Sequence, residues 1–338
     1  MTVLVTGGSG FIGVNVVETL LERGDEVVLF DVGDLPPGAS RVLEPYGNRL
    51  VMERGSVLDA EHLDAIVRRH AIDRVIHAAA VTSGPAREAR DPASIVEVNL
   101  RGTISILEAA RKHSVTRTLY VGSGAAYGES LYRLPRLYED TPSIPTTLYS
   151  ITKHAAERMC MRLRGLWKID VVCVRLGTAI GPWERDTGVR DNFGTHSQLA
   201  AMALAGESAV LPSHEVQRDW VYSHDVARAL IQLAYAPALR STIYNVSSGL
   251  TWENPIAAWC EALRRTFPRF SYRTARADDE ANIWYTDRDR GLMDIGRLTR
   301  DVGFRPRFPM REAYAAYIDW LQRTPFRSAG NESKGVVQ

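Results

Sequence analysis

The amino-terminal stretch constrains the fold more than any other feature of the chain. Residues 2–6 form a short run rich in β-branched side chains, and glycines follow at positions 7, 8, 10 and 13. A helical pattern then covers Phe11–Arg23. Glycines at this spacing let a backbone turn tightly and approach a pyrophosphate, and the following helix directs unpaired N–H groups at the phosphates. Gly7, Gly10 and Gly13 therefore predict a dinucleotide-binding unit, with an ordinary strand–turn–helix as the alternative.

A carboxylate indicates which dinucleotide binds. The expected second strand, Glu26–Phe30, ends in Asp31, about 20 residues after the glycine-rich turn. A carboxylate there can accept hydrogen bonds from the adenosine ribose hydroxyls, but it repels a 2′-phosphate. The sequence thus predicts NAD rather than NADP. The alternative is that Asp31 is a solvated residue that begins the loop Val32–Arg41.

Apolar β-rich runs alternate with helical patterns in the first half of the chain, which indicates βαβ crossovers. Strands are expected near Val3–Thr6, Glu26–Phe30, Arg49–Glu53, Arg74–Ala78, Thr118–Gly122 and Val171–Arg175. Helices are expected near Phe11–Arg23, Glu61–Arg69, Pro92–His113 and Tyr149–Leu166. The predicted fold class is α/β, a Rossmann-type doubly wound parallel sheet with a smaller C-terminal α/β lobe for substrate.

The length of 338 residues suggests about two domains. The NAD-binding domain is expected at residues 1–175 plus about 220–250, where Ile243–Val246 forms a further strand. The substrate-binding lobe is expected at residues 176–219 plus 251–326 and begins with a glycine-rich loop. Residues 327–338 are polar, and a flexible tail is expected there.

Charge and composition exclude several classes of function. The formal net charge is +1 without any block of like charges, so nothing favours nucleic acid or an anionic membrane as partner. No apolar run reaches the length of a membrane span, and a turn that begins at residue 7 leaves no room for a signal peptide, so a cytoplasmic enzyme is expected. Cys160, Cys173 and Cys260 are isolated and are expected in the core. No residue spacing typical of a metal site occurs.

Two further motifs suggest acid–base chemistry. Tyr149 and Lys153 are spaced i and i+4, which places them one turn apart on one face of a helix. A neighbouring cation favours the phenolate and brings a tyrosine into the range of a general base. Ser123 follows the strand Thr118–Gly122, where parallel sheets bind ligands. The alternatives are a surface Tyr–Lys pair and an ordinary turn serine.

Taken together, the motifs resemble those of the extended short-chain dehydrogenase/reductases, which include nucleotide-sugar epimerases, dehydratases and decarboxylases. The motifs are Gly7-x-x-Gly10-x-x-Gly13, His77-Ala78-Ala79-Ala80, Asn99-Leu100-Arg101-Gly102-Thr103, Ser123 four residues before Tyr127-Gly128, Tyr149-x-x-x-Lys153, Arg218-Asp219-Trp220-Val221-Tyr222 with Asp225, and Gly303-Phe304-Arg305-Pro306. The resemblance covers nearly the whole chain.

This resemblance implies an enzyme that transfers hydride between NAD and a carbinol carbon. Tyr149 would act as general base or acid, Lys153 would lower its pKa and hold the nicotinamide ribose, and Ser123 would bond the substrate oxygen. The residues implied for the cofactor are Gly7, Gly10, Phe11, Ile12, Gly13, Asp31, Ser56, Val57, Ala78, Ala79, Ala80, Asn99, Tyr149, Lys153, Leu176 and Thr178. Those implied for the small-molecule substrate are Ser123, Thr178 and Arg218. A homodimer is also implied, paired through the helices that begin near Pro92 and Tyr149.

Departures from the family pattern narrow the activity. Family dehydratases carry Thr-Asp-Glu where this chain has Ser123-Gly124-Ala125, so no acid for elimination is present. Thr178 replaces an asparagine that is usual in nucleotide-sugar enzymes, and the late arginine that meets the diphosphate is not obvious: ungapped alignment places Trp284 there, while Arg288 or Arg290 fits after a small shift. The preferred reading is an NAD-dependent oxidoreductase of a sugar, sugar acid or similar small polyhydroxylated substrate. The alternatives are a UDP- or dTDP-sugar epimerase and a non-catalytic NAD-binding regulator.

Overall fold

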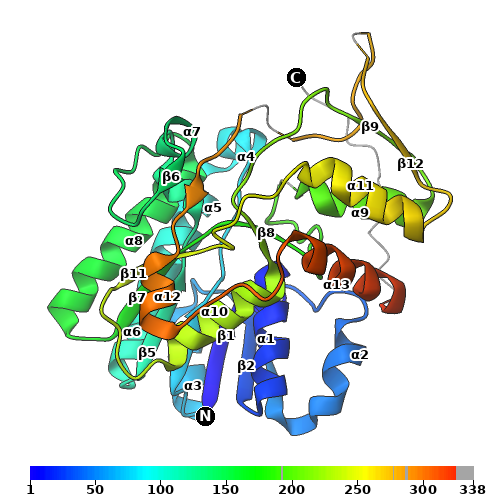
Figure 1. The fold of residues 1–338 in the computed structure, drawn as a ribbon. Helices are drawn as coiled ribbons and strands as arrows, with labels where there is room; N and C mark the ends of the chain where they lie inside the picture. Colours follow the sequence, from blue (N-terminus) through cyan, green and yellow to red (C-terminus); the bar gives the residue numbers. More distant parts are fainter. Residues whose placement is uncertain (192, 277, 286–287, 325–338) are drawn as a thin grey trace.

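The computed structural model describes residues 1–191, 193–276, 278–285 and 288–324. A seven-stranded sheet forms its centre, in the order β11-β7-β5-β4-β1-β2-β3, and all neighbouring strands are parallel (Figure 1). The strands are β1 (Thr2–Thr6), β2 (Glu26–Asp31), β3 (Leu50–Arg54), β4 (Arg74–His77), β5 (Arg117–Val121), β7 (Val171–Leu176) and β11 (Ile243–Val246). The predicted doubly wound sheet is confirmed, and β11 adds a seventh strand at its edge beside β7.

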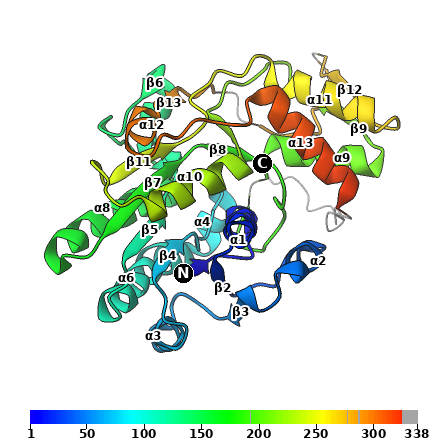
Figure 2. The same cartoon turned by 60° about the horizontal axis from the view of Figure 1, so that its bottom comes forward.

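Helices cover both faces of this sheet (Figures 1 and 2). On one face α1 (Phe11–Arg23) and α10 (Ser223–Tyr235) pack side by side and share one buried core with the strands. On the other, α3 (Ala60–Arg69) packs against α6 (Gly102–Lys112), with α8 (Leu148–Trp167) beside α6. β5 and β7 are buried along almost their whole length, as central parallel strands require. None of the helices in the described ranges is long and apolar enough to span a membrane.

The single helix predicted over Pro92–His113 is not a uniform α-helix. It consists of α5 (Pro92–Val96), a π-helical turn η2 (Glu97–Arg101) and α6. Asp91 begins the stretch, because its side chain accepts a hydrogen bond from Ser94 N at 3.2 Å. One π turn hardly alters a hydrophobic periodicity, so the sequence pattern did not indicate it.

A second buried core lies in a lobe at the carboxyl-end side of the sheet (Figure 1). The lobe contains β8 (Thr178–Ile180), α9 (Thr195–Ala205), β9 (Ser208–Leu211), β10 (Trp220–Tyr222), α11 (Pro255–Thr266), β12 (Ser271–Thr274) and α13 (Met310–Arg323). Its core is aromatic: the rings of Trp259 and Tyr317 stack with centroids 5.1 Å apart. The expected tail, residues 327–338, lies outside the described residues.

The shorter elements connect these layers. They are α2 (Ala39–Leu43), η1 (Glu44–Arg49), α4 (Pro85–Arg90), η3 (Gly124–Tyr127), α7 (Ser130–Arg133), β6 (Arg136–Leu137), β13 (Leu292–Met293) and α12 (Gly296–Val302). Leu298 of α12 and Phe304 pack in the core of the main sheet, although both fall within the range expected for the substrate lobe.

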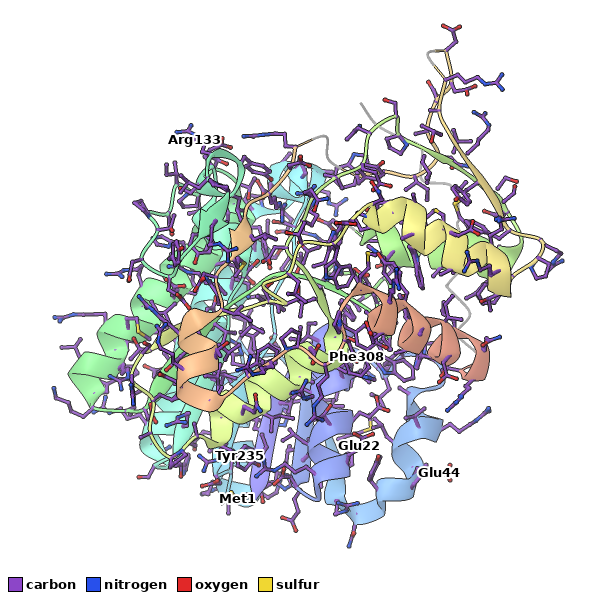
Figure 3. All side chains as sticks on the ribbon, viewed as in Figure 1. Met1, Glu22, Glu44, Arg133, Tyr235 and Phe308 are labelled. Atoms are coloured by element: carbon purple, nitrogen blue, oxygen red, sulfur yellow. The ribbon has the colours of Figure 1, made fainter. Side chains whose placement is uncertain are left out.

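The chain enters α13 along a segment that is fixed to α10. The Asp225 carboxylate accepts hydrogen bonds from the backbone N–H groups of Arg307 and Phe308 at 2.9–3.0 Å. The Phe308 ring packs against Tyr222 with centroids 4.8 Å apart, between α10 and α13 (Figure 3). Asp225 therefore joins the main sheet layer to the second lobe.

Candidate active site

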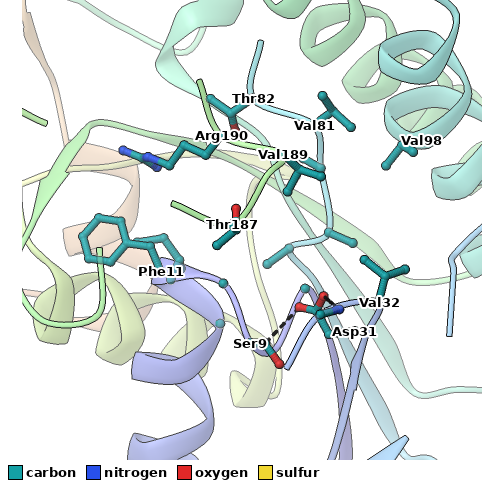
Figure 4. A pocket seen from close by; sticks show the side chains of 18 of the residues that line it. Ser9, Phe11, Asp31, Val32, Val81, Thr82, Val98, Thr187, Val189 and Arg190 are labelled. Carbon is teal, nitrogen blue, oxygen red and sulfur yellow. Dashed lines mark hydrogen bonds between the residues drawn. The ribbon is translucent and has the colours of Figure 1, made fainter. Parts of the chain in front are cut away.

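A cavity of about 460 Å³ lies at the carboxyl ends of the central strands. From β1 the chain runs through β2 to β3 on one side, and it returns to β4 on the other side of β1. The strand order therefore reverses between β1 and β4, and such switch points are where open α/β sheets bind ligands. The residues predicted for the cofactor that line this cavity are Gly7, Gly10, Phe11, Ile12, Gly13, Asp31, Ser56, Val57, Ala78, Ala79, Ala80, Tyr149, Lys153 and Leu176. Figure 4 shows Phe11 and Asp31 among them. Asn99 and Thr178 are not among the described lining residues.

The glycine-rich turn leaves no space for side chains. Gly7 has φ +67°, and a Cβ at this position would lie 2.6 Å from Ala79 N. A Cβ at Gly13 would lie 2.0 Å from the Gly7 carbonyl oxygen. Gly10 is the N-cap of α1 and has no side chain to bond the first N–H groups of the helix, so these groups remain for an anionic ligand. The turn therefore fits the pyrophosphate of a dinucleotide.

Asp31 is held at the edge of the same cavity by two backbone bonds. One carboxylate oxygen accepts a hydrogen bond from Ser9 N at 2.9 Å and the other from Gly33 N at 3.0 Å (Figure 4). Each carboxylate oxygen can accept a second bond, which leaves capacity for ribose hydroxyls. The geometry supports the role predicted for Asp31 over that of a solvated loop residue.

A capping box fixes the start of the helix that carries Tyr149. Thr147 and Ser150 exchange side-chain to backbone bonds at 3.0–3.2 Å, and Glu88 accepts a hydrogen bond from Tyr149 N at 3.1 Å. Tyr149 therefore lies in the first full turn of α8.

Lys153 lies one turn further along α8 and is buried. Its Nζ donates to the Val121 carbonyl at 3.1 Å and lies 6.0 Å from the centre of the Tyr149 ring. Burial lowers the pKa of Lys153 to about 8. Its ammonium group is therefore charged at neutral pH but loses its proton as the pH rises through about 8.

Asn99 lies behind this pair, in the π turn. Its amide accepts a hydrogen bond from Val81 N at 2.9 Å and donates to the Val81 carbonyl and to Thr152 Oγ1, each at 3.1 Å. Since Val81 lines the cavity and Thr152 belongs to α8, Asn99 connects the cavity wall to the helix of Tyr149. Its place supports a positioning role, whereas cofactor contact was predicted.

Ser123 follows Gly122, a lining residue, at the carboxyl end of β5. Its Oγ accepts a hydrogen bond from Ala125 N at 3.1 Å and caps η3. The serine is thus a turn residue, but an accepting oxygen keeps its own proton for a substrate oxygen.

Arginine side chains gather around Tyr132 of α7. The Arg288 guanidinium lies over the ring at 3.9 Å from its centre, and Arg290 Nη2 donates to the phenol at 3.4 Å. Arg218 is buried, and among the residues that the structure describes neither its Nη1 nor Nε of Arg290 has a hydrogen-bond partner. Burial and then the charge of Arg290 lower the pKa of Arg218 to about 10, so it stays charged at neutral pH. An anionic ligand would complete this arrangement.

The sequence reasoning missed one wall of the cavity. Residues 185–187 and 189–190, from the glycine-rich loop expected to begin the substrate-binding lobe, line the cofactor cavity. Val81, Thr82 and Val98 also line it. The only sequence signal was a loop rich in glycine and charge, which does not specify what the loop covers.

Comparison with known proteins agrees with this geometry. Residues 3–247 match the model of the NAD dependent epimerase/dehydratase family. A UDP-glucose 4-epimerase of Halalkalibacterium halodurans is 34% identical over 241 residues, which cover 68% of this chain and 69% of the epimerase. A dTDP-glucose 4,6-dehydratase of Xanthomonas campestris pv. campestris is 26% identical over 336 residues, or 94% of this chain and 92% of the dehydratase.

A solved structure extends the comparison to the fold. The UDP-glucose 4-epimerase of Thermus thermophilus, in complex with NAD, superposes with a TM-score of 0.76 at 27% identity and covers 96% of this chain and 99% of its own. The glycine cradle and these relatives identify the cofactor as NAD and the protein as an enzyme. The chain belongs to the NAD-dependent epimerase/dehydratase family of extended short-chain dehydrogenase/reductases.

Proposed function

We propose that this enzyme is an epimerase of a nucleotide sugar and that it regenerates its NAD in each cycle. The observation that carries the proposal is the buried Arg218 beside the partly buried Arg290: Nη1 of Arg218 and Nε of Arg290 have no hydrogen-bond partner among the described residues. A nucleoside diphosphate offers two adjacent anionic groups to two such cations. The similarity to UDP-glucose 4-epimerases supports this substrate class over the small polyhydroxylated compound preferred from sequence.

The residues around the cavity suit a reversible oxidation. Bound NAD supplies a hydride acceptor and donor. Tyr149 takes the proton of a sugar hydroxyl while hydride leaves the same carbon, and it returns the proton once the resulting ketone is reduced on its other face. The Lys153 ammonium favours the phenolate of Tyr149, and Ser123 donates a hydrogen bond to the reacting oxygen.

The residues after Ser123 favour epimerisation over dehydration. Gly124 and Ala125 have no acid to protonate a leaving hydroxyl group, whereas simple proton exchange by Tyr149 needs none. The alternative of a small substrate rests on Thr178, which pairs in the strand β8 with Trp220, and on the late arginine that was not obvious in the sequence. Arg290 is a candidate for that arginine, so Thr178 alone is a weaker argument than the buried Arg218 with Arg290 beside it.

Conversion of UDP- and dTDP-sugars tests the reaction. Purified protein with catalytic amounts of NAD is expected to interconvert two sugar epimers, followed by NMR. Accumulation of stoichiometric NADH would indicate a dehydrogenase, and a keto-deoxy product would indicate a dehydratase; either result contradicts the proposal. Conversion of none of these sugars together with oxidation of sugar acids would restore the small-substrate reading.

Binding of UDP tests the site separately. Calorimetry is expected to give about micromolar affinity, and Arg218→Ala is expected to weaken it by about tenfold or more, the effect of losing one charged hydrogen bond. Arg264→Ala, which removes an exposed arginine paired with Glu261 on α11, is the matched control. Only millimolar UDP binding by the wild type would refute the diphosphate site.

We further propose that the enzyme is a homodimer. Val96 of α5 and Ile151 of α8 are exposed apolar residues on helices that pack against each other. Burial of both in a two-fold interface is expected from the family resemblance. Light scattering should give twice the mass of the chain, and Val96→Glu with Ile151→Glu should give monomers; a monomeric wild type at micromolar concentration would refute the pairing.

A further inference from the structure

One segment crosses the mouth of the cofactor cavity from outside the main sheet layer. Thr187, Val189 and Arg190 line the same cavity as Ser9 and Asp31 (Figure 4). The segment is held at residues that follow β2 on one side and at residues that follow β4 on the other. A bound dinucleotide would therefore lie beneath it.

Several polar contacts join the segment to the residues that follow β4. Arg87 of α4 forms a bidentate ion pair with Asp191, with N–O distances of 2.6–2.9 Å. Gly84 N donates to the same carboxylate at 2.9 Å. Thr82 N donates to the Val189 carbonyl at 2.8 Å, so the backbone pairs there as well. Several bonds would have to break together before this end could leave.

On the other side, one arginine of the segment binds the loop that follows β2. Arg185 Nη2 donates to the Asp34 carbonyl at 2.6 Å, and Arg185 lines the cavity together with Asp31. Its Nε is buried without a hydrogen-bond partner among the described residues. The guanidinium thus retains a donor at the adenosine end of the site.

The base of the segment is buried and packed. Trp183 is buried against α1 and packs edge-on against Trp320 with ring centroids 5.0 Å apart. The carboxylate of Glu184 accepts a hydrogen bond from Gly194 N at 2.9 Å and pairs with Arg190. The residues between Glu184 and Asp191 are therefore fixed at both ends.

The charge of the cofactor gives these residues a role. The pyrophosphate of NAD carries two negative charges, and buried phosphate needs paired cations or hydrogen-bond donors. Among the described lining residues the cationic side chains are Lys153, Arg185 and Arg190. Lys153 lies beside Tyr149, at the nicotinamide end, and Arg190 is already paired with Glu184. This leaves Arg185 as the cation for the adenosine side.

We propose that residues 184–191 form a clasp over bound NAD, in which Arg185 binds the phosphate on the adenosine side and the Arg87–Asp191 ion pair keeps the clasp closed. The cofactor then leaves only when that pair breaks. Slow release is what a cycle needs when the same NAD molecule is reduced and reoxidised. The clasp requires only that NAD binds, which holds for an epimerase and for a dehydrogenase alike.

Release of NADH from the purified protein tests the clasp without any sugar. Bound NADH is chased with excess NAD in a stopped-flow fluorimeter, and the dissociation rate is read from the loss of its fluorescence. Arg185→Gln and Arg87→Leu are each expected to raise this rate by about tenfold or more, since each removes a charged hydrogen bond. Asp191→Asn removes the same ion pair with a nearly isosteric side chain. If Arg87→Leu does not fold, the NADH release rate of Asp191→Asn tests the role of the pair.

Arg264→Leu, an exposed arginine far along α11, is the control and should release NADH at the wild-type rate. Release at that rate from both Arg185→Gln and Asp191→Asn would overturn the clasp. Because no sugar is present, such a result would leave the epimerase assignment untouched. Conversely, faster release from these variants in a protein that converts no nucleotide sugar would support the clasp and refute the proposed function.

Discussion

Replacement of Asp31 by serine is expected to reduce the preference for NAD over NADP. The carboxylate is fixed at the cavity edge by its bonds from Ser9 N and Gly33 N, so it cannot turn away from a 2′-phosphate. Two unit charges about 5 Å apart repel by about 1–3 kcal/mol for effective dielectric constants between about 80 and 20. That energy corresponds to a change of about 5- to 150-fold in the ratio of the two dissociation constants. Arg185 lies beside Asp31 and would offer the phosphate a cation once the carboxylate is gone.

The assay is fluorescence titration with NADH and NADPH, and the quantity compared is the ratio of their dissociation constants. Asp34→Ser is the matched control, because it removes the same charge from the same loop. The Asp34 side chain is 84% exposed and pairs with Arg54 at 3.3 Å, so water screens it. An equal change in both variants would refute the local argument, and a wild type that prefers NADPH would refute the assignment of Asp31.

Three further outcomes concern single side chains. Tyr149→Phe is expected to reduce turnover by about 10²–10⁴-fold while NADH affinity stays within about twofold, measured by single-turnover kinetics and titration. Glu157→Gln leaves Arg175 buried without its carboxylate partner, so urea unfolding is expected to show a loss of about 3–5 kcal/mol, whereas Glu261→Gln, which removes a surface ion pair with Arg264, should leave the unfolding curve almost unchanged. Burial raises the pKa of Asp219 to about 7, so the folded protein holds that proton more tightly than the unfolded chain and loses stability as the pH rises from about 4 to 7. Asp219→Asn should therefore have a higher melting temperature than the wild type at pH 8, and the difference in melting temperature should vanish near pH 4. A difference that does not change with pH would contradict the assignment to the Asp219 proton.

Local spacing was enough to predict the parts of the site that one strand, turn or helix presents. The glycine-rich turn, Asp31 and the Tyr149–Lys153 pair all line one cavity, because each motif lies at the carboxyl end of a strand or in a turn of helix beside it. These features depend on short-range geometry, which a sequence pattern records.

Contacts between distant segments could not be predicted from local spacing. Nothing in the chain indicates that Arg185 lies beside Asp31 or that Arg290 joins Arg218 around Tyr132, because these approaches depend on the path of loops without periodicity. The π turn at Asn99 was hidden for another reason: it changes the hydrogen-bond pattern of a helix while it leaves the spacing of apolar residues almost intact.

The aromatic core of the second lobe has a consequence for how the protein unfolds. Leu199 and Trp220 of this core precede β11 in the sequence, and Trp259 and Tyr317 follow it. β11 itself completes the edge of the main sheet, so neither lobe is one continuous stretch of chain. Partial unfolding of the second lobe would loosen the chain segments on both sides of β11. Heat should therefore disrupt both lobes in one cooperative transition, and the chain offers no single cut that would release either lobe as an independent domain.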